Sequence, residues 1–303
     1  MFQPGVAVAG LILLAGCTAA ATPPRPSEPV DQDLMSGWRL ARFALEERKY
    51  DRAAGLYARV LERAYARDDP SAIGDVGYEL AVVRLRQLAP DAAALQARQT
   101  RDELRRRGEE PFAELYLVEA VALYEMGKRA GAEAMADQAI ALAPGPSDPV
   151  ARRAWFLNGR IAADRADQAG VDRALAALGR AQNPELQADR LELIGRRDLL
   201  DHRPDRALPA FRTSADLRRD AGDYLGMARV LALAGEAAEG ADVITEAADL
   251  YFRAGRSAEV EGRRADAQRW LGAAARLAQT TGQAEILAQA NDRLARLAEA
   301  EDR

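Results

Sequence analysis

The 303-residue sequence contains one cysteine, one histidine and only two lysines, Lys49 and Lys128. A single cysteine excludes an intramolecular disulfide. One cysteine and one histidine are also too few for a zinc site of the usual composition. The histidine, His202, stands in Asp-His-Arg-Pro-Asp, a sequence typical of a turn between two helices, where we expect a solvated side chain. The sequence therefore predicts no metal site.

Recognisable catalytic motifs are also missing. There is no glycine-rich phosphate loop, no His-Glu-x-x-His and no Gly-x-Ser-x-Gly. Neither lysine follows a serine by three residues, which excludes a Ser-x-x-Lys nucleophile pair. We therefore predict that the protein is not an enzyme, has no catalytic residue and needs no cofactor.

No excess of basic charge is present either. The chain carries 47 acidic and 42 basic residues, a formal net charge of −5, and a pI near 5.3. Nucleic acid is an improbable partner, because phosphate neutralisation needs a basic surface. Valine, isoleucine and threonine are scarce, whereas alanine, leucine, arginine, glutamate and glutamine dominate. These abundant residues lose least on entering a helix, so the composition predicts an all-α fold.

The one long apolar run, residues 5–16, is too short to span a bilayer as a helix, which takes about 20 residues. It has the form of a signal-peptide core and ends in Leu14-Ala15-Gly16-Cys17, which resembles the bacterial lipobox at all four positions. The resemblance implies a lipoprotein signal peptide over residues 1–16, cleaved after Gly16. It also implies a covalent diacylglycerol and an acyl chain such as palmitate on Cys17. The alternative is a buried apolar helix with an inert cysteine.

The segment 17–33 begins with that cysteine and contains four prolines, which predict a semi-extended tether. At about 3.1 Å per residue it could hold a domain roughly 50 Å from a membrane. Residue 18 is Thr and not Asp. By resemblance to sorted lipoproteins, this implies an outer-membrane, periplasm-facing location, with exposure on the cell surface as the alternative.

From residue 34 to residue 303 the sequence is periodic, with small and bulky residues at fixed spacing. The clearest unit is 113–144, where the spacing predicts two helices. The first has Tyr116, Ala120 and Leu123 on one face, and the second has Ala132, Ala136 and Ala139 on one face and ends at Pro144. The pattern resembles the tetratricopeptide repeat and recurs from residues 34, 74, 152, 188, 228 and 265. This resemblance implies an α-solenoid of about seven units, a right-handed superhelix of antiparallel helix pairs.

Two features inside the repeats allow alternatives. The sequence Pro-Gly-Pro-Ser-Asp-Pro at 144–149 is the strongest internal breaker and marks either a joint between two arrays or an ordinary inter-repeat loop. The arginines at 101, 105, 106 and 107 resemble an anion site. Their place just before Gly108 favours a simpler interpretation, in which cations complement the negative end of a helix.

The repeat resemblance also implies a binding surface. In tetratricopeptide proteins the concave groove is lined by positions 2, 5, 9, 12 and 13 of each unit. Here those positions carry aromatic, leucine and arginine anchors of the kind that interfaces use: Trp38, Arg42, Tyr78, Leu117, Tyr124, Phe156, Arg160 and Arg196. The alternative is that half of them pack between helices. The Lys/Asn carboxylate clamp of chaperone-binding relatives is missing.

Together these patterns predict a membrane-anchored scaffold or adapter of the bacterial cell envelope, with an envelope protein or peptide as its partner. The alternative is an accessory subunit of a polysaccharide, secretion or pilus export machine. A set of stacked groove aromatics would favour a sugar ligand. A patch of apolar residues with arginine would favour a protein.

Overall fold

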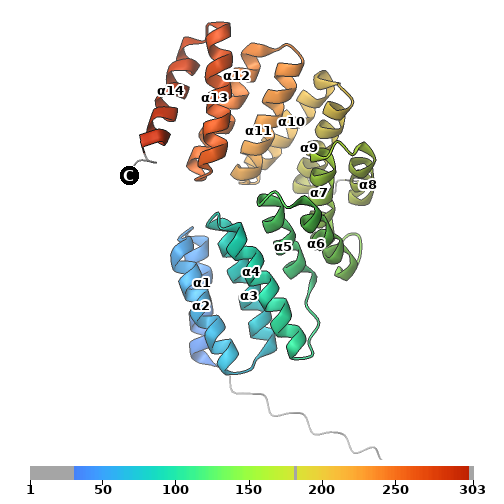
Figure 1. Ribbon diagram of the computed structural model, residues 1–303, viewed down its shortest axis with the longest axis vertical. Helices are drawn as coiled ribbons and strands as arrows, with labels where there is room; N and C mark the ends of the chain where they lie inside the picture. Colours follow the sequence, from blue (N-terminus) through green and yellow to red (C-terminus); the bar gives the residue numbers. More distant parts are fainter. Residues whose placement is uncertain (1–30, 181–182, 300–303) are drawn as a thin grey trace, which may run out of the picture.

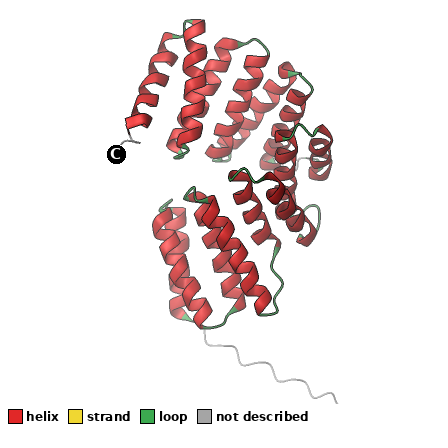
Figure 2. Cartoon of the chain, viewed as in Figure 1, coloured by secondary structure: helices red, strands yellow, loops and turns green. Residues whose placement is uncertain are grey.

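The computed structural model describes residues 31–180 and 183–299, and these ranges contain fourteen α-helices and no strand. The first seven helices are α1 (Gln32–Glu46), α2 (Tyr50–Ala66), α3 (Pro70–Arg86), α4 (Pro90–Arg106), α5 (Ala113–Glu125), α6 (Arg129–Leu142) and α7 (Pro149–Asp164). The others are α8 (Gln168–Leu178), α9 (Pro184–Leu200), α10 (Pro204–Asp220), α11 (Tyr224–Gly240), α12 (Ile244–Val260), α13 (Arg264–Thr281) and α14 (Ala284–Glu299). Consecutive helices form hairpins that stack into a curved array (Figure 1, Figure 2). The predicted all-α solenoid is confirmed.

The predicted signal peptide, Cys17 and nearly all of the tether lie outside the described residues. Within the described ranges, no helix combines the length and the apolar character needed to cross a bilayer. The tether prediction extended to residue 33, but α1 begins at Gln32. The reason is local, because the Asp31 carboxylate accepts the backbone N–H groups of Asp33 and Leu34 and so caps the helix.

Short polar side chains and prolines fix most helix starts. Six helices follow an Asp or Asn whose side-chain oxygen accepts an N–H of the first turn: Asp31, Asp69, Asp148, Asp167, Asn183 and Asp223. Such a cap stabilises a helix by about 0.5–2 kcal/mol. Five helices have a proline in the first turn, where its missing N–H loses no hydrogen bond.

Tight turns with one left-handed residue reverse the chain between helices. Twelve of the thirteen connections contain a residue of positive φ in their described part, and six of these twelve are glycines. The exposed His202, with φ of 56°, is one of the other six and lies between α9 and α10, where the sequence predicted a turn. The left-handed residue ends one helix and lets the next return antiparallel to it.

Small residues at the helix contacts let bulky partners approach closely. Gly195 of α9 lies against Phe211 of α10, and Gly235 of α11 lies against the ring of Tyr251 of α12. A Cβ at Gly195 would stand only 2.6 Å from Cε1 of Phe211, which is fully buried. The repeat pattern predicts this arrangement of a small residue in the first helix against a bulky one in the second.

The proline-rich segment 144–149 does not interrupt the core. Tyr116 of α5, Ala136 of α6, and Leu157 and Ile161 of α7 belong to one apolar cluster. The helices before and after this segment therefore share buried surface, and the third and fourth hairpins stack as direct neighbours.

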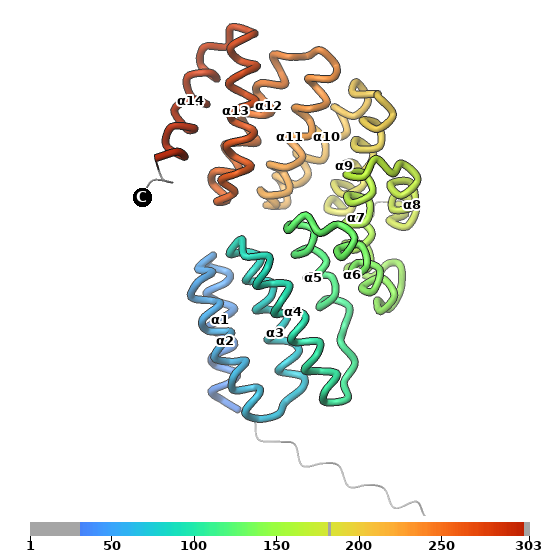
Figure 3. The backbone as a smooth tube through the Cα atoms, in the orientation of Figure 1, coloured from blue at the N-terminus to red at the C-terminus, as the bar shows by residue number. Residues whose placement is uncertain are grey.

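The array curves until its last helices approach its first ones (Figure 1, Figure 3). Two ion pairs join the turn between α12 and α13 to the N-terminal half. Arg48 Nη2 lies 2.6 Å from Glu261 Oε2, and Arg263 Nη2 lies 2.5 Å from Glu125 Oε2. We call these two ion pairs the clasp. Because they link residues 213 and 138 positions apart, they close the concave side of the solenoid.

Reversing one charge of the clasp should open the array without unfolding it. In Arg48→Glu, residue 48 would repel Glu261, and small-angle X-ray scattering should show a larger radius of gyration. Global stability should change by less than about 1 kcal/mol, because the Arg48 side chain is solvent-exposed. The charge-swapped Arg48→Glu/Glu261→Arg protein should regain the wild-type radius. An unchanged radius in the single variant would mean that apolar packing alone closes the array.

Candidate functional site

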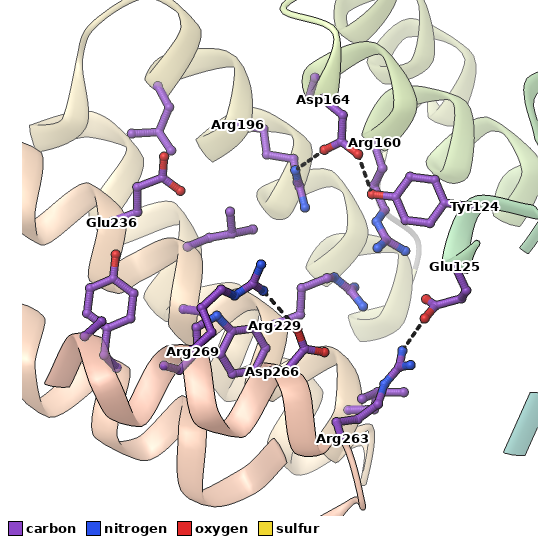
Figure 4. Close-up of a pocket in the computed structure, with 18 of the residues that line it drawn as sticks. Tyr124, Glu125, Arg160, Asp164, Arg196, Arg229, Glu236, Arg263, Asp266 and Arg269 are labelled. Carbon is purple, nitrogen blue, oxygen red and sulfur yellow. Dashed lines mark hydrogen bonds and ion pairs between the residues drawn. The ribbon is translucent and has the colours of Figure 1, made fainter. Parts of the chain in front are cut away.

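A pocket of about 670 Å³ lies on the concave side of the array, where the first helices of the third to seventh hairpins converge (Figure 4). Residues of α5, α7, α9, α11 and α13 supply most of its wall. Six arginines line it: Arg129, Arg160, Arg196, Arg229, Arg263 and Arg269. Four carboxylates accompany them: Glu125, Asp164, Glu236 and Asp266. The pocket surface therefore has more guanidinium groups than carboxylates.

One buried carboxylate beneath this wall holds the arginines together. Glu192 of α9 has no exposed surface. Arg229 binds it in bidentate fashion, with Nε 3.1 Å from Oε1 and Nη2 2.9 Å from Oε2. Arg218 Nη2 also donates to Oε2 at 2.9 Å, and Arg196 Nε to Oε1 at 3.3 Å. Arg160 Nε lies farther away, 3.8 Å from Oε1. A single negative charge thus organises cations from four helices.

The charges of this cluster shift one another strongly. Burial alone would raise the pKa of Glu192, but Arg229, Arg218 and Arg196 outweigh it and hold the pKa well below its usual value. Burial alone would lower the pKa of Arg229, but Glu192 raises it above its ordinary value. Burial, helped by the charge of Arg229, lowers the pKa of Arg160 to about 10. All three groups are therefore charged at neutral pH.

Arg160 is the least satisfied of these cations. Its Nε is buried and makes no hydrogen bond. Its guanidinium lies over two rings instead, 4.5 Å from the ring centroid of Tyr124 and 5.8 Å from that of Phe156. Such cation–π contacts position the group, but they supply no acceptor for its N–H donors.

A second carboxylate, Asp164, stands at the mouth of the pocket and positions its polar edge. Its Oδ2 accepts the Tyr124 hydroxyl at 2.8 Å and Arg129 Nε at 3.2 Å, while its Oδ1 accepts Arg196 Nη1 at 3.3 Å. Apolar and aromatic side chains also line the pocket, most of them on α11 and α13: Leu225, Ala232, Leu233, Tyr251, Trp270 and Ala273. Arg229 and Arg269 stand on the same two helices, and the Arg269 guanidinium lies 5.3 Å from the Trp270 ring centroid. The pocket therefore combines guanidinium groups with apolar surface.

Asp189 and Asp223, which also pair with Arg218, should titrate differently from each other. Burial raises the pKa of Asp189 to about 6, although Arg218 donates to it at 2.7 Å. Burial would also raise the pKa of Asp223, but the Gly226 N–H and Arg218 lower it below its usual value. Asp189 therefore takes up a proton between neutral and mildly acidic pH, whereas Asp223 stays ionised.

This difference predicts a pH-dependent stability with a definite sign. Between about pH 4, the pKa of an unfolded aspartate, and pH 6, the folded protein binds more protons than the unfolded chain at Asp189. The contribution of Asp189 is therefore fully present below pH 4 and is lost as the pH rises through about 6. Relative to Asp189→Asn, wild type should lose about 1–3 kcal/mol of unfolding free energy between pH 4 and pH 7, measured by urea denaturation.

Asp223→Asn is the matched control, because asparagine also caps a helix. Since the folded pKa of Asp223 is lowered, its contribution is lost only as the pH falls below about 4. The wild-type minus Asp223→Asn difference should stay flat between pH 4 and pH 7. A flat difference for Asp189→Asn as well would disprove the raised pKa.

A smaller pocket of about 460 Å³ lies near the N-terminal end, between α1, α3 and the start of α5. Glu79 accepts Trp38 Nε1 at 2.7 Å and Arg42 Nε at 2.9 Å, and the Arg42 guanidinium lies 4.9 Å from the Trp38 ring centroid. Tyr78 meets Phe112 edge to face, with ring centroids 6.1 Å apart. With Asp75, Glu79 and Glu114 in its wall, this pocket is more acidic than the larger one.

The structure distributes the eight predicted groove residues over three environments. Tyr124, Arg160 and Arg196 line the larger pocket, and Arg42 and Tyr78 line the smaller one. Trp38 contacts both Arg42 and Glu79 beside the smaller pocket. The remaining two pack against apolar clusters between helices: Leu117 and Phe156.

Several pocket residues were not among those eight, although the repeat register contains them. Applied to the units that begin at residues 228 and 265, the same positions fall on Arg229 and Glu236 and on Asp266 and Arg269, all of which line the larger pocket. In the unit that begins at residue 188 they include Glu192. Its full burial had no sequence signal, because a glutamate on a helix is normally solvated.

The arginines near residue 105 divide between two roles. Arg106 and Arg107 pair with Glu103 on the surface of α4, in agreement with the helix-end interpretation. Arg101 does not fit the helix-end interpretation. It is buried, pairs with the buried Glu119 and lies 4.3 Å from the Tyr116 ring centroid. A buried charge needs a buried partner, and Glu119 of the next hairpin supplies it. Among the described residues, no group of three or more His, Cys, Asp or Glu side chains could hold a metal ion.

The fold is that of a tetratricopeptide-like α-solenoid. The sequence matches no protein-family model and no curated protein, but many solved structures resemble it. NprR solved with its cognate peptide NprX is 14% identical with a TM-score of 0.62, covering 88% of this chain and 79% of that one. The apo quorum sensor NprR from B. thuringiensis has a TM-score of 0.59 at 10% identity, covering 89% of each chain. PilW, a type IV pilus biogenesis factor, has a TM-score of 0.51 at 18% identity, covering 73% of this chain and 92% of that one.

Proposed function

We propose that this protein is a repeat scaffold that binds a protein or peptide partner in its larger concave pocket and performs no catalysis. The observation that carries the proposal is the convergence of five first helices on one pocket of arginine and apolar side chains. Arginine and aromatic residues in such a concave, partly desolvated site are typical interface anchors. NprR, which has a similar fold, was solved with a peptide, and this supports the same use here.

The sugar-binding alternative has less support. A polysaccharide site would need several aromatic faces stacked along the groove, whereas this pocket contains three aromatic residues, Tyr124, Tyr251 and Trp270, beside six arginines. A role in pilus or secretion-channel assembly is compatible with the scaffold proposal, and the similarity of the fold to PilW makes it worth testing.

We further propose that the lipobox at 14–17 places this scaffold on the bacterial outer membrane, facing the periplasm, through acyl chains on Cys17. The solenoid would then present its concave side to an envelope partner. The two parts of the proposal are independent, because the pocket does not depend on the anchor.

The scaffold proposal is tested by cross-linking the full-length acylated protein in membranes and identifying partners by mass spectrometry. We expect at least one envelope protein to be enriched, with cross-links to α7, α9, α11 or α13. Recovery of monomer alone, or cross-links confined to the second helices of the hairpins, would overturn it.

The anchor is tested separately by Cys17→Ala. Without the thiol that accepts diacylglycerol, the protein should remain an unprocessed precursor that lacks the acyl-chain mass, as shown by intact mass spectrometry and membrane fractionation. Ser27→Ala, a nearby change in the predicted tether, should be processed normally. Normal processing of Cys17→Ala would rule out the anchor.

A further inference from the structure

We infer that the ligand of the larger pocket is an acidic peptide segment that combines Asp or Glu with aliphatic or aromatic side chains. This inference rests on the proposed function and adds the chemistry of the partner. It follows from the combination of guanidinium groups and apolar surface in one pocket.

Four arginines of the pocket pair with Asp164 or with the buried Glu192, and we call this part of the lining the cationic wall: Arg129, Arg160, Arg196 and Arg229. Asp164 is the only carboxylate among them that lines the pocket. Glu192, which holds three of them, is fully buried below. Asp189 and Asp223 pair with Arg218, which does not line the pocket. An anion entering the pocket therefore meets positive groups first.

The other acidic residues of the pocket leave this excess in place. Glu125 pairs with Arg263 and Asp266 pairs with Arg269, so each of these carboxylates offsets one cation. Glu236 lies toward one end of the pocket, away from Tyr124 and Asp164 (Figure 4). The centre of the cationic wall thus keeps its charge.

Arg160 is the cation that the buried carboxylate pairs with most weakly. Its side chain lies against the pocket, and its buried Nε faces Glu192 Oε1 at 3.8 Å, which is too long for a hydrogen bond. A planar guanidinium binds a carboxylate through two parallel N–H···O bonds. A ligand carboxylate placed beside Arg160 and Arg196 would supply such acceptors in a site partly shielded from water.

The apolar part of the lining favours a peptide over a small anion. Leu225, Leu233 and Trp270 offer surface that inorganic phosphate or a free carboxylate would leave unused. About 670 Å³ is room for several residues of an extended peptide. An acidic side chain beside Arg160 and Arg196 and an apolar one beside Leu225, Leu233 and Trp270 would use both kinds of surface at once.

The test is selection from a random ten-residue peptide library on the purified chain, followed by fluorescence anisotropy with the selected peptides. We expect enrichment of Asp or Glu together with Leu, Ile, Phe or Trp. Replacing the acidic residues of a selected peptide by Asn and Gln should weaken its affinity at least tenfold. Enrichment of neutral or basic peptides, or of none, would overturn the inference.

Matched variants locate the binding. Arg129→Gln/Arg269→Gln removes two pocket cations whose side chains are 45% and 68% exposed, so the fold should be retained. This variant should bind the acidic peptide at least tenfold more weakly. Arg219→Gln, an exposed arginine on α10 outside the pocket, should bind within twofold of wild type. Equal affinity of the pocket variant and wild type would overturn the inference.

Competition distinguishes the ligand class. Inorganic phosphate and a polyuronate should displace the peptide only at far higher concentration, because neither uses the apolar surface of the pocket. Stronger binding of polyuronate than of any selected peptide would overturn the inference. If cross-linking still found a protein partner at the pocket while selection gave no acidic peptide, the scaffold proposal would stand and only the acidic-peptide inference would fail.

Discussion

Glu192→Gln is expected to lower the free energy of unfolding by about 3–5 kcal/mol at neutral pH, which is the usual cost of removing one partner from a buried ion cluster. The amide is the same size but carries no charge, so Arg160, Arg196, Arg218 and Arg229 would face one another without their shared carboxylate. Urea denaturation followed by circular dichroism measures the loss.

The pH dependence of this loss provides a second criterion. The folded pKa of Glu192 is lowered, so its contribution is present above about pH 4.3, the unfolded value, and disappears as the pH falls through the folded pKa. The difference between wild type and Glu192→Gln should therefore shrink in strong acid.

Glu236→Gln provides the matched control for Glu192→Gln. It is the same substitution at an exposed glutamate that lines the pocket, and stability should change by no more than about 0.5 kcal/mol. If Glu192→Gln were destabilised no more than Glu236→Gln, the ion cluster would not be what holds α7, α9, α10 and α11 together.

Gly195→Ala is expected to destabilise the protein by about 1–3 kcal/mol, although alanine is the better helix former. The new methyl group would stand 2.6 Å from the fully buried ring of Phe211, so α9 and α10 would have to separate or the ring would have to leave its position. Thermal denaturation should show a fall of roughly 2–4 °C for each kcal/mol.

The opposite sign is expected for the same substitution at Gly55. This glycine lies on the exposed side of α2, where a Cβ would meet no atom within 4 Å. Gly55→Ala should therefore stabilise the protein by about 0.5–1 kcal/mol. In addition, Phe211→Leu should partly relieve Gly195→Ala in the double variant. Destabilisation of similar size at both glycines would show that contact with Phe211 is not the cause.

Much of the fold could be predicted from the sequence, because the features that determine it act over short distances along the chain. The Asp and Asn caps, the first-turn prolines and the spacing of small and bulky residues each act within one or two helices. The contact of Gly195 with Phe211 is an example, since the two residues are sixteen positions apart within one hairpin. Repeat register likewise placed Tyr124, Arg160 and Arg196 on the first helices, on the side that lines the pocket.

Only the tertiary structure decided how the pocket-lining sides of the first helices lie relative to one another. The rotation from each hairpin to the next accumulates along the array, and no single repeat encodes the sum. The accumulated rotation brings Arg263 to Glu125 and Arg48 to Glu261. It also gathers arginines from three helices around Glu192 of α9, whose sequence neighbours give no sign of burial. Sequence alone thus determined an α-solenoid with arginine and aromatic residues on its first helices, and long-range packing brought them together in one pocket that combines guanidinium groups with apolar surface.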